Sequence, residues 1–449
     1  MSKIKIFQIA LFLGLMGLFS SCERYFEGVN DNPNQPEVVP ANMLLPAAQG
    51  AIAYGMGGDI SRFTSIIMQY AEGVDRQFLV FQTYQITETE TDNWWRFQMY
   101  GGGLKDLYNM LAIAEADGSS QYSGIGKILM AYGIMCITDV VGDAPYSEAF
   151  LEADNLTPAW DSQQDLYTSI INLLTEAKTD LADPTAPIAP GADDLIYGGD
   201  VDLWTKTANV LLARAYIHLG KVDANNYQNA LNALGTEGVD SYGSNADDAV
   251  FAFGTSPTES APWFQYIGQR NDIGYLNNYI NQQMTAQGDP RHDVLLDTAN
   301  NSLGALYGNA DAPYRFASYA EQKFIEAEAA FQTGDGSRAA SAHNAAVMAS
   351  LMYCGVDGTA PAFEAAHAQQ TAGTISLQEI MEQKYVAMFL DPEAFSDWRR
   401  TGFPAITAVP NNVTGGIIPR RLPYPQSERL YNGSNFQDRA ITTSVWWDQ

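Results

Sequence analysis

The fold is decided by residues 204–220 of this 449-residue chain, which read WTKTANVLLARAYIHLG. Five residues of this stretch recur on one face at helical spacing: Trp204, Ala208, Leu212, Ala215 and Leu219. Gly220 follows as the predicted C-cap of this helix. A second apolar stripe begins soon afterwards: Tyr227, Ala230, Leu231 and Leu234. The two stripes together predict a helix–glycine–helix hairpin over 204–235.

The same layout returns later in the chain around Gly334. Its stripes are Ala320, Phe324, Ala327 and Phe331 before the glycine, and Ala342, Ala345, Ala349 and Met352 after it. Alanine where paired helices cross lets them approach closely, which is typical of tetratricopeptide-like hairpins. We expect clear hairpin units at 204–235 and 317–352, and weaker ones near 104–138 and 164–182. The units are not contiguous, so the sequence does not predict a simple solenoid.

The rest of the chain alternates shorter helical signals with long irregular stretches. Helices are predicted at 41–56 and 58–72, and a later helix begins with the capping box Ser376-Leu-Gln-Glu379. The irregular stretches are rich in Gly, Pro, Asn and Asp and span 183–203, 236–275, 353–374 and 402–440. Loops this long in a compact domain are usually functional. We therefore predict a mainly α fold, in which a helical scaffold carries a long-loop, irregular ligand-binding layer.

The N-terminus has the pattern of a bacterial lipoprotein signal. Lys3 and Lys5 precede an apolar stretch, 6–19, that is short for a membrane span, and Ser20-Ser21 lead directly into Cys22. Phe19 departs from the Leu, Val or Ile that is usual at its position in such signals. We expect a signal peptide over 1–21, a lipidated Cys22, a tether over 22–40 and a single domain over 41–449. The alternative is an ordinary secretory signal with a chance cysteine.

The charge of the chain argues against polyanionic partners. The sequence holds 24 basic and 52 acidic residues, and removal of 1–21 takes away two lysines and no acid, which moves the net charge from -28 to near -30. A surface this negative repels phosphate backbones and anionic headgroups, so no nucleic-acid partner is expected. No later apolar run approaches the roughly 20 residues needed to cross a bilayer, which leaves the lipid as the expected attachment to the membrane.

Two cysteines remain besides Cys22. Cys136 lies in the apolar run Met135-Cys136-Ile137 and is expected to be a small buried hydrophobe. A disulfide between Cys136 and Cys354 stays open, because an exported protein meets an oxidising compartment.

The sequence lacks the common catalytic motifs. It has four histidines and no HExxH, paired CxxC, Walker loop, GxGxxG or G-x-S-x-G elbow, and Gly101-Gly102-Gly103 lacks the Lys-Ser/Thr of a phosphate cradle. Carboxylate pairs for glycoside hydrolysis are available among 52 acids, so a secreted all-helical glycoside hydrolase is an alternative. We expect no cofactor. A bound calcium ion stays open, although no segment has the ligand spacing of an EF-hand.

Seven phrases occur in order along the chain and together carry a family resemblance. They are 30–36 (NDNPNQP), 138–149 (TDVVGDAPYSEA), 213–220 (ARAYIHLG), 289–291 (DPR), 325–329 (IEAEA), 397–400 (DWRR) and 419–425 (PRRLPYP). Each phrase alone is weak, but their order behind a lipoprotein signal resembles the SusD/RagB family of outer-membrane lipoproteins, closest to its SusD-like branch. The resemblance covers nearly all of 22–449.

This resemblance implies a helical, tetratricopeptide-containing fold and a surface protein without catalytic chemistry. Such a lipoprotein lies as a lid on a SusC-type TonB-dependent outer-membrane transporter, captures an oligosaccharide or a peptide, and delivers it into the barrel. A second alternative is a tetratricopeptide adaptor that binds only protein. Its partner groove would lie on the concave face of the hairpins and not in the aromatic loops.

Two segments combine aromatic and polar side chains in the manner of a sugar site, where flat rings pack on sugar faces and polar groups bind hydroxyls. They run from Asp75 to Arg96 and from Pro262 to Asp272. The candidate ligand-binding residues are Asp75, Arg76, Gln82, Trp94, Trp95, Trp263, Tyr266 and Arg270. At least one of Trp94 and Trp95 is expected in the core, because both open a predicted helix. Trp263 has no helical stripe to join.

Overall fold

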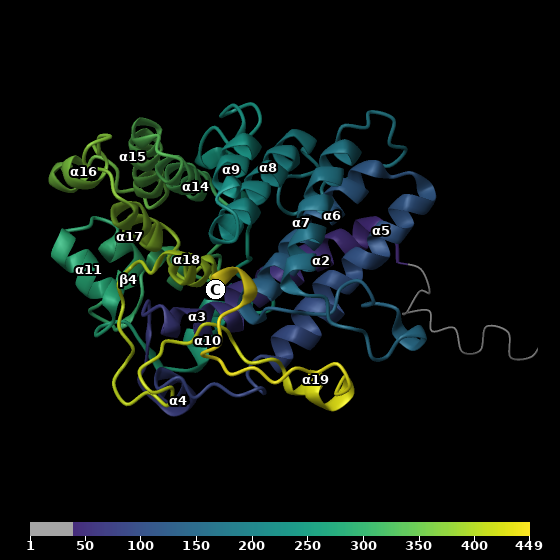
Figure 1. Cartoon of the computed structure of the whole chain (residues 1–449), viewed down its shortest axis with the longest axis horizontal. Coiled ribbons are helices and arrows are strands. Elements are labelled where there is room, and N and C mark those ends of the chain that lie inside the picture. The colour runs from purple at the N-terminus through teal and green to yellow at the C-terminus, as the bar shows by residue number, and fades with distance from the viewer. Residues whose placement is uncertain (1–38) are drawn as a thin grey trace, which may run out of the picture. The chain divides into compact units, whose positions relative to one another are not determined.

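The computed structural model describes residues 39–449, and Ala41–Gln449 form one compact unit. The predicted signal over 1–21, Cys22 and the tether as far as residue 38 lie outside the described residues. The unit is mainly helical, as the sequence predicts, and its helices are numbered from α2 (Figure 1).

Paired helices follow one another across the unit from α5 to α16 (Figure 1). They are α5 (Lys105–Asp117), α6 (Ser120–Val141), α7 (Gln163–Leu181), α8 (Val201–His218), α9 (Asn225–Leu234), α14 (Tyr319–Gln332), α15 (Gly336–Tyr353) and α16 (Pro361–His367). Helix α8 packs on α9, and α14 packs on α15, as the apolar stripes predict. Helix α6 packs on both α5 and α7, which gives the weaker signals the same paired arrangement.

Polar side chains fix where the clear hairpins begin and turn. Asp200, Ser318 and Asp335 cap α8, α14 and α15, each by accepting hydrogen bonds from backbone N–H groups of the first turn. Gly334 has φ of +86°, the left-handed conformation that ends α14 and that a side chain would strain.

Gly220 does not act as the predicted C-cap. The chain passes through it in a 3₁₀ turn, η4 (Leu219–Lys221), without a positive φ. A Cβ at Gly220 would lie 2.4 Å from the ring of Tyr227. The glycine is therefore required for the close approach of Tyr227 on α9, and not for a left-handed turn.

The N-terminal helices are shorter than predicted, and a bend separates them. Helix α2 (Ala41–Gly55) runs into the π-helical turn η1 (Met56–Ile60) and then into α3 (Ser61–Ile67). The bend lies at Gly58, whose φ of -103° and ψ of -112° are not helical. A Cβ at Gly57 would lie 3.2 Å from the ring of Tyr314, so the bend brings the backbone against a strand.

Short elements make up the rest of the described chain, including parts of the stretches predicted to be irregular. The strands within residues 39–449 pair antiparallel two by two: β1 (Glu72–Gly73) with β3 (Ile273–Gly274), β2 (Ala249–Phe251) with β6 (Tyr314–Ala317), and β4 (Leu296–Asp297) with β5 (Ser302–Leu303). The other helices are α4 (Arg76–Gln82), η2 (Trp94–Leu104), η3 (Glu152–Asp154), η5 (Asn245–Asp247), α10 (Pro262–Gln269), α11 (Tyr279–Gln287), α12 (His292–Leu295), α13 (Ala305–Gly308), α17 (Leu377–Ala387), α18 (Glu393–Thr401), α19 (Gln426–Tyr431) and η6 (Trp446–Asp448). Of these, η5, α10 and α19 lie in stretches predicted to be irregular, as does α16. The capping residue predicted for α17 is correct, since Ser376 Oγ accepts the N–H of Glu379 at 3.1 Å.

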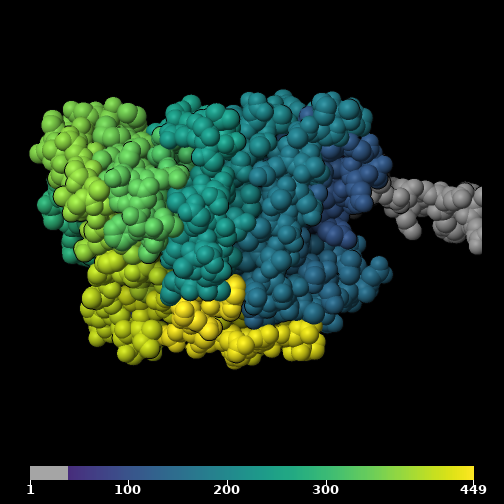
Figure 2. Space-filling view, turned by 45° about the horizontal axis from the view of Figure 1, so that its top comes forward, coloured from purple at the N-terminus to yellow at the C-terminus, as the bar shows by residue number. Residues whose placement is uncertain are grey.

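The C-terminal residues form a band along one edge of the unit, against helices from the middle of the chain (Figure 2). Charged and aromatic contacts hold this band. The Arg420 guanidinium lies 4.8 Å from the ring centre of Trp398 and is paired with Asp448. Trp447 is fully buried, and its indole N–H donates to Asp139 Oδ1 on α6 at 3.0 Å.

The structure answers two questions that the sequence raised, one about a disulfide and one about apolar runs. Cys136 and Cys354 are both free, so the disulfide left open by the sequence is not formed. One helix of the described chain, Ser120–Val141, is long and apolar enough to cross a membrane, contrary to the expectation that no later run reaches that length. Its most apolar window is 89% buried inside the protein, so core packing accounts for its composition.

Candidate ligand-binding site

A two-stranded sheet brings the two candidate segments together. Strand β1 pairs with β3 through Glu72↔Gly274 and Gly73↔Ile273, and the N–H of Val74 donates to the carbonyl of Asp272 at 2.9 Å. The start of α4 therefore lies beside the end of α10, although nearly 200 residues separate them in the sequence. Figure 1 shows α3, α4 and α10 on the same side of the unit, away from the row of hairpins.

Tyr266 on α10 is the centre of this site. Its ring lies 4.5 Å from the guanidinium of Arg62 on α3 and 5.4 Å from that of Arg270. The ring edge of Phe78 on α4 packs against it at 5.4 Å between ring centres. The phenol O–H donates to Asp272 Oδ1 at 2.5 Å, and burial together with this carboxylate raises the pKa of Tyr266 above its usual value. Tyr266 therefore stays a neutral, half-buried ring held in one orientation.

The two arginines beside Tyr266 are themselves held by acceptors. Arg62 is paired with Asp59 one helical turn earlier. Arg270 is paired with Asp272 and donates to Gln77 Oε1 on α4 at 3.3 Å. The site thus combines a half-buried aromatic ring with guanidinium groups near it, and the buried Asp272 holds both Tyr266 and Arg270 in place. Aromatic and polar groups of these kinds are common in carbohydrate sites.

Three other candidate residues lie at the two ends of α4 and have different roles. Asp75 caps α4 by accepting the N–H of Arg76 at 2.8 Å, and both of these charged side chains are exposed to solvent. Their place next to Gln77 leaves them available at the edge of the site. Gln82 accepts the N–H of Gly73 at 2.8 Å through its side-chain oxygen, so it supports β1.

Trp263 belongs to a helix, contrary to the expectation of a loop residue. Pro262 occupies the first position of α10, where its missing N–H costs nothing, and Trp263 follows it. The indole is 5% exposed, and its N–H donates to Ser61 Oγ at 2.9 Å. Arg62 lies 6.0 Å from its ring centre, so Trp263 lies beneath the Tyr266 site and borders a pocket described below.

Trp94 and Trp95 are not part of this site. Both are buried, with exposures of 0% and 3%, and their aromatic neighbours are each other and Tyr100. The N–H of Trp95 donates to Glu428 Oε1 at 3.2 Å, and the other oxygen of Glu428 accepts the N–H of Trp160 at 3.0 Å. The expectation that one of the pair faces a ligand cleft is wrong for this structure, because the π-helix η2 turns both rings inward.

Arg62 was missed by the sequence analysis. It occupies an apolar helical stretch that gives no loop signal, and its distance from Tyr266 in the chain is large. The spacing of Asp59 and Arg62 at i and i+3 was the available signal, because it predicts a charged pair on one helix face. Gln77 and Asp272 lay inside the two segments but carried no feature that set them apart.

Within residues 39–449, one group of three potential metal ligands converges: Asp139, His218 and Glu393. His218 Nδ1 lies 3.3 Å from Asp139 Oδ2, and Nε2 lies 2.7 Å from Glu393 Oε1. The two carboxylates thus face opposite nitrogens of the ring. This arrangement fits a protonated imidazole between two anions better than a metal ion bound by all three side chains. Burial opposes this charge, but the two carboxylates outweigh it and raise the pKa of His218 to about 9.

Comparison with known proteins identifies relatives over most of the chain. The SusD-like family model described as "Starch-binding associating with outer membrane" matches residues 33–310 and 297–425. No curated protein sequence matches the chain.

Solved structures share the fold. A SusD/RagB family protein from Bacteroides thetaiotaomicron VPI-5482 has 23% identity and a TM-score of 0.75, over 91% of this chain and 99% of its own. A SusD homolog from Bacteroides fragilis NCTC 9343 has 21% identity and a TM-score of 0.74, over 92% and 99%. A chitin-binding SusD homolog from Flavobacterium johnsoniae has 23% identity and a TM-score of 0.71, over 91% and 97%.

Proposed function

Since the chain belongs to the SusD-like family and is a nutrient-binding protein associated with the outer membrane, we propose that it captures oligosaccharides and delivers them to a SusC-type TonB-dependent transporter. Peptides are the second ligand class. The proposed role is ligand binding without a catalytic step. We therefore prefer it to the alternative of a glycoside hydrolase.

The geometry around Tyr266 carries this proposal. An aromatic ring held by Phe78 and Asp272 has two guanidinium groups within 4.5 and 5.4 Å of its centre, on elements far apart in the sequence. A sugar ring can pack its C–H face on such an aromatic side chain, and the bordering donors and acceptors suit its hydroxyls. Asp75, Arg76 and Arg270 supply charged groups at the border, and Trp263 lies on the far side of Arg62, whose guanidinium is 6.0 Å from the Trp263 ring centre.

Chitin fragments are the first defined ligand to test. One solved relative is named a chitin-binding SusD homolog and another a chitin-binding protein. Each is only 23% identical to this chain, so the ligand of the relatives is a starting point and not an assignment.

The binding experiment titrates the full chain in detergent with oligomers of N-acetylglucosamine, with an oligosaccharide pool and with a peptide pool. Tyr266→Ala should weaken binding by about ten- to hundredfold, because loss of one aromatic contact costs on the order of 1–3 kcal/mol. Tyr266→Phe should retain most of the affinity, since it keeps the ring. Trp263→Ala is titrated in the same way, after its melting temperature has been shown to equal that of the wild-type protein.

Tyr431→Ala is the matched control, because Tyr431 is 69% exposed on α19, outside the proposed site. Equal binding by wild-type protein and a well-folded Tyr266→Ala variant would remove Tyr266 from the site. Failure of the wild-type protein to bind any oligosaccharide would overturn the proposed ligand class.

The lipid anchor and the transporter are tested separately. We propose that Cys22 is acylated and that the protein faces the outside of the outer membrane. Cys22→Ala should release the chain from the membrane fraction, and the wild-type protein should co-purify with a SusC-type transporter from mildly solubilised membranes. A variant that still sediments through a detergent-sensitive attachment would contradict the anchor.

A further inference from the structure

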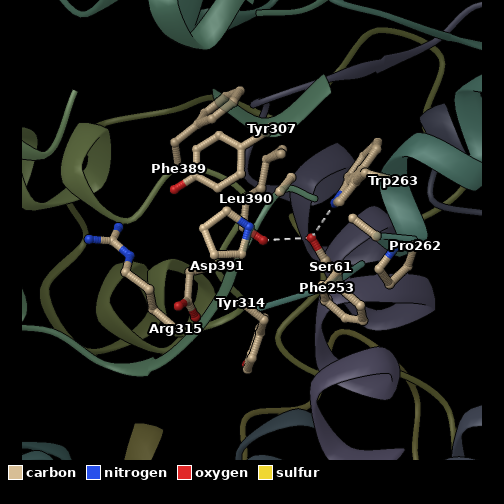
Figure 3. Close-up of a pocket in the computed structure, with 14 residues that line it drawn as sticks. Ser61, Phe253, Pro262, Trp263, Tyr307, Tyr314, Arg315, Phe389, Leu390 and Asp391 are labelled. Atoms are coloured by element: carbon tan, nitrogen blue, oxygen red, sulfur yellow. Dashed lines mark hydrogen bonds between the residues drawn. The ribbon is translucent and has the colours of Figure 1, made fainter. Parts of the chain in front are cut away.

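A small pocket of about 50 Å³ borders Trp263, where α3, α10, β6 and the turn between α17 and α18 meet. Figure 3 shows Trp263 and Pro262 entering from one side and Tyr307, Phe389 and Asp391 from the other. The pocket shares Trp263 with the site above, so an inference about its ligand rests on the proposed function. Its chemistry, however, differs from that of the Tyr266 surface.

Aromatic side chains form most of the wall. Trp263 and Phe389 are buried, whereas Phe253 and Tyr307 are half-buried and border the pocket. Tyr307 and Phe389 pack on each other with ring centres 5.8 Å apart. The polar groups of Trp263 and Ser61 are already used, because the indole N–H donates to Ser61 Oγ and the Ser61 hydroxyl donates to the carbonyl of Leu390 at 2.6 Å.

Asp391 is the one anionic group of this wall. Its Oδ1 accepts the backbone N–H of Glu393 at 2.9 Å, and within residues 39–449 its carboxylate has no further hydrogen bond and no ion pair. Burial raises the pKa of this carboxyl group to about 7, although the nearby Arg214 acts in the opposite direction. A carboxylate placed in this way lacks a cationic partner.

The charged groups around Asp391 already have partners elsewhere. Arg214 on α8 binds both oxygens of Glu321 on α14, each at 2.6 Å. Arg315 on β6 borders the pocket, but its guanidinium lies 3.9 Å from the ring centre of Tyr353, donates to the carbonyl of Ala387 and is paired with Asp248. Glu393 on α18 is paired with His218. None of these bonds neutralises Asp391.

The turn that presents Asp391 is strained. Leu390 has φ of +65°, a left-handed conformation that a leucine rarely adopts. The hydrogen bond from Ser61 to its carbonyl holds this conformation in place. Strained residues that the surrounding structure holds fixed are concentrated at ligand sites.

We propose that this pocket binds the primary ammonium group of a ligand. Aromatic faces attract an ammonium ion, and a carboxylate that lacks a counter-ion completes its charge neutralisation. The excess negative charge of the chain, -28, raises the local concentration of cations around it. An amino sugar with a free amine and a lysine side chain both carry this group.

The experiment titrates the full chain in detergent at pH 8 by calorimetry with n-butylammonium chloride and with n-butanol, its uncharged isostere. The cation should bind at least tenfold more tightly than the alcohol. Asp391→Asn keeps the acceptor for the N–H of Glu393 and removes the charge, so it should abolish this preference. Tyr307→Leu keeps the apolar volume, and it should weaken the cation several-fold and leave the alcohol unchanged.

A shift to pH 5.5 should weaken the cation in wild-type protein but not in Asp391→Asn. Equal binding of cation and alcohol, or a preference that survives in Asp391→Asn, would overturn the proposal.

The source of the amine is resolved by two ligand pairs, a glucosamine disaccharide and an Nα-acetyl-lysine amide, each against its N-acetylated form. The pair with the larger loss on acetylation identifies the source, and no loss in either pair would overturn the proposal. Oligosaccharide binding that depends on Tyr266 but not on Asp391 would preserve the proposed function whatever the amine result.

Discussion

His218 should make the stability of this protein fall at alkaline pH. The imidazole on α8 joins Asp139 on α6 to Glu393 on α18, and Tyr167 on α7 contacts its Nδ1 at 2.7 Å. The ring has no exposure to solvent, so water does not screen these contacts. Its protonated form therefore ties four helices together.

The magnitude follows from the raised pKa of His218. The folded-state value of about 9 lies about 2.5 units above the usual 6.5, which corresponds to about 3 kcal/mol of folding stability. Because the folded pKa is raised, this contribution is fully present below pH 6.5 and is lost as pH rises through 9. The same contacts depress the pKa of Glu393, whose contribution is lost as pH falls through its lowered folded value.

The assay is urea unfolding at intervals from pH 6 to pH 9.5. Wild-type protein should lose about 3 kcal/mol over this range more than His218→Gln does, because the variant lacks the titrating group. At pH 6, His218→Gln should itself be less stable by about 3–5 kcal/mol, since it leaves two buried carboxylates without their cation. His292→Gln, on a histidine bonded to the exposed Asp293, is the control and should retain the wild-type slope. Identical slopes for wild type and His218→Gln would refute the reasoning.

Two further changes test a close contact within the α8–α9 hairpin and the N-cap of α17. Gly220→Ala should destabilise the fold by about 1–3 kcal/mol, because the new Cβ lies 2.4 Å from the ring of Tyr227, whereas Gly191→Ala, with open space around it, should have little effect in the same urea titration. Ser376→Ala should lower the free energy of unfolding by about 1 kcal/mol, because α17 loses its N-cap. Ser376→Thr keeps the acceptor and should restore most of this loss. An unchanged unfolding midpoint in Ser376→Ala would contradict the role of the cap.

The sequence was sufficient to predict the hairpins because their signals are local. The stripes from Trp204 to Leu234 and from Ala320 to Met352 each lie within one continuous segment, where apolar spacing and capping residues agree. Gly220 shows the limit of such signals. Its place at the end of a stripe suggested a cap, but the reason for it lies in the ring of Tyr227, which only the packed hairpin brings near.

The candidate site was less predictable because it is built from distant segments. Tyr266 and Arg270 were found from composition, whereas Arg62 reaches the same ring from α3 and Asp391 borders the adjacent pocket from the turn after α17. One of Trp94 and Trp95 was expected to face a ligand, because aromatic residues near polar ones look alike in a loop and in a buried π-helix, but both are buried. Only the contacts of Trp95 with Glu428 and Tyr100 reveal its place.

Hydrogen–deuterium exchange with a bound oligosaccharide tests the central claim most directly, because it locates the ligand without any substitution. The full chain is compared with and without N-acetylglucosamine oligomers, or with the component of the oligosaccharide pool that binds most tightly. We predict slower exchange in 72–82 and 262–274, the segments joined by β1 and β3, and unchanged exchange in α14 and α15. Protection confined to the hairpins α8–α9 and α14–α15 would contradict the account and favour a protein-binding adaptor.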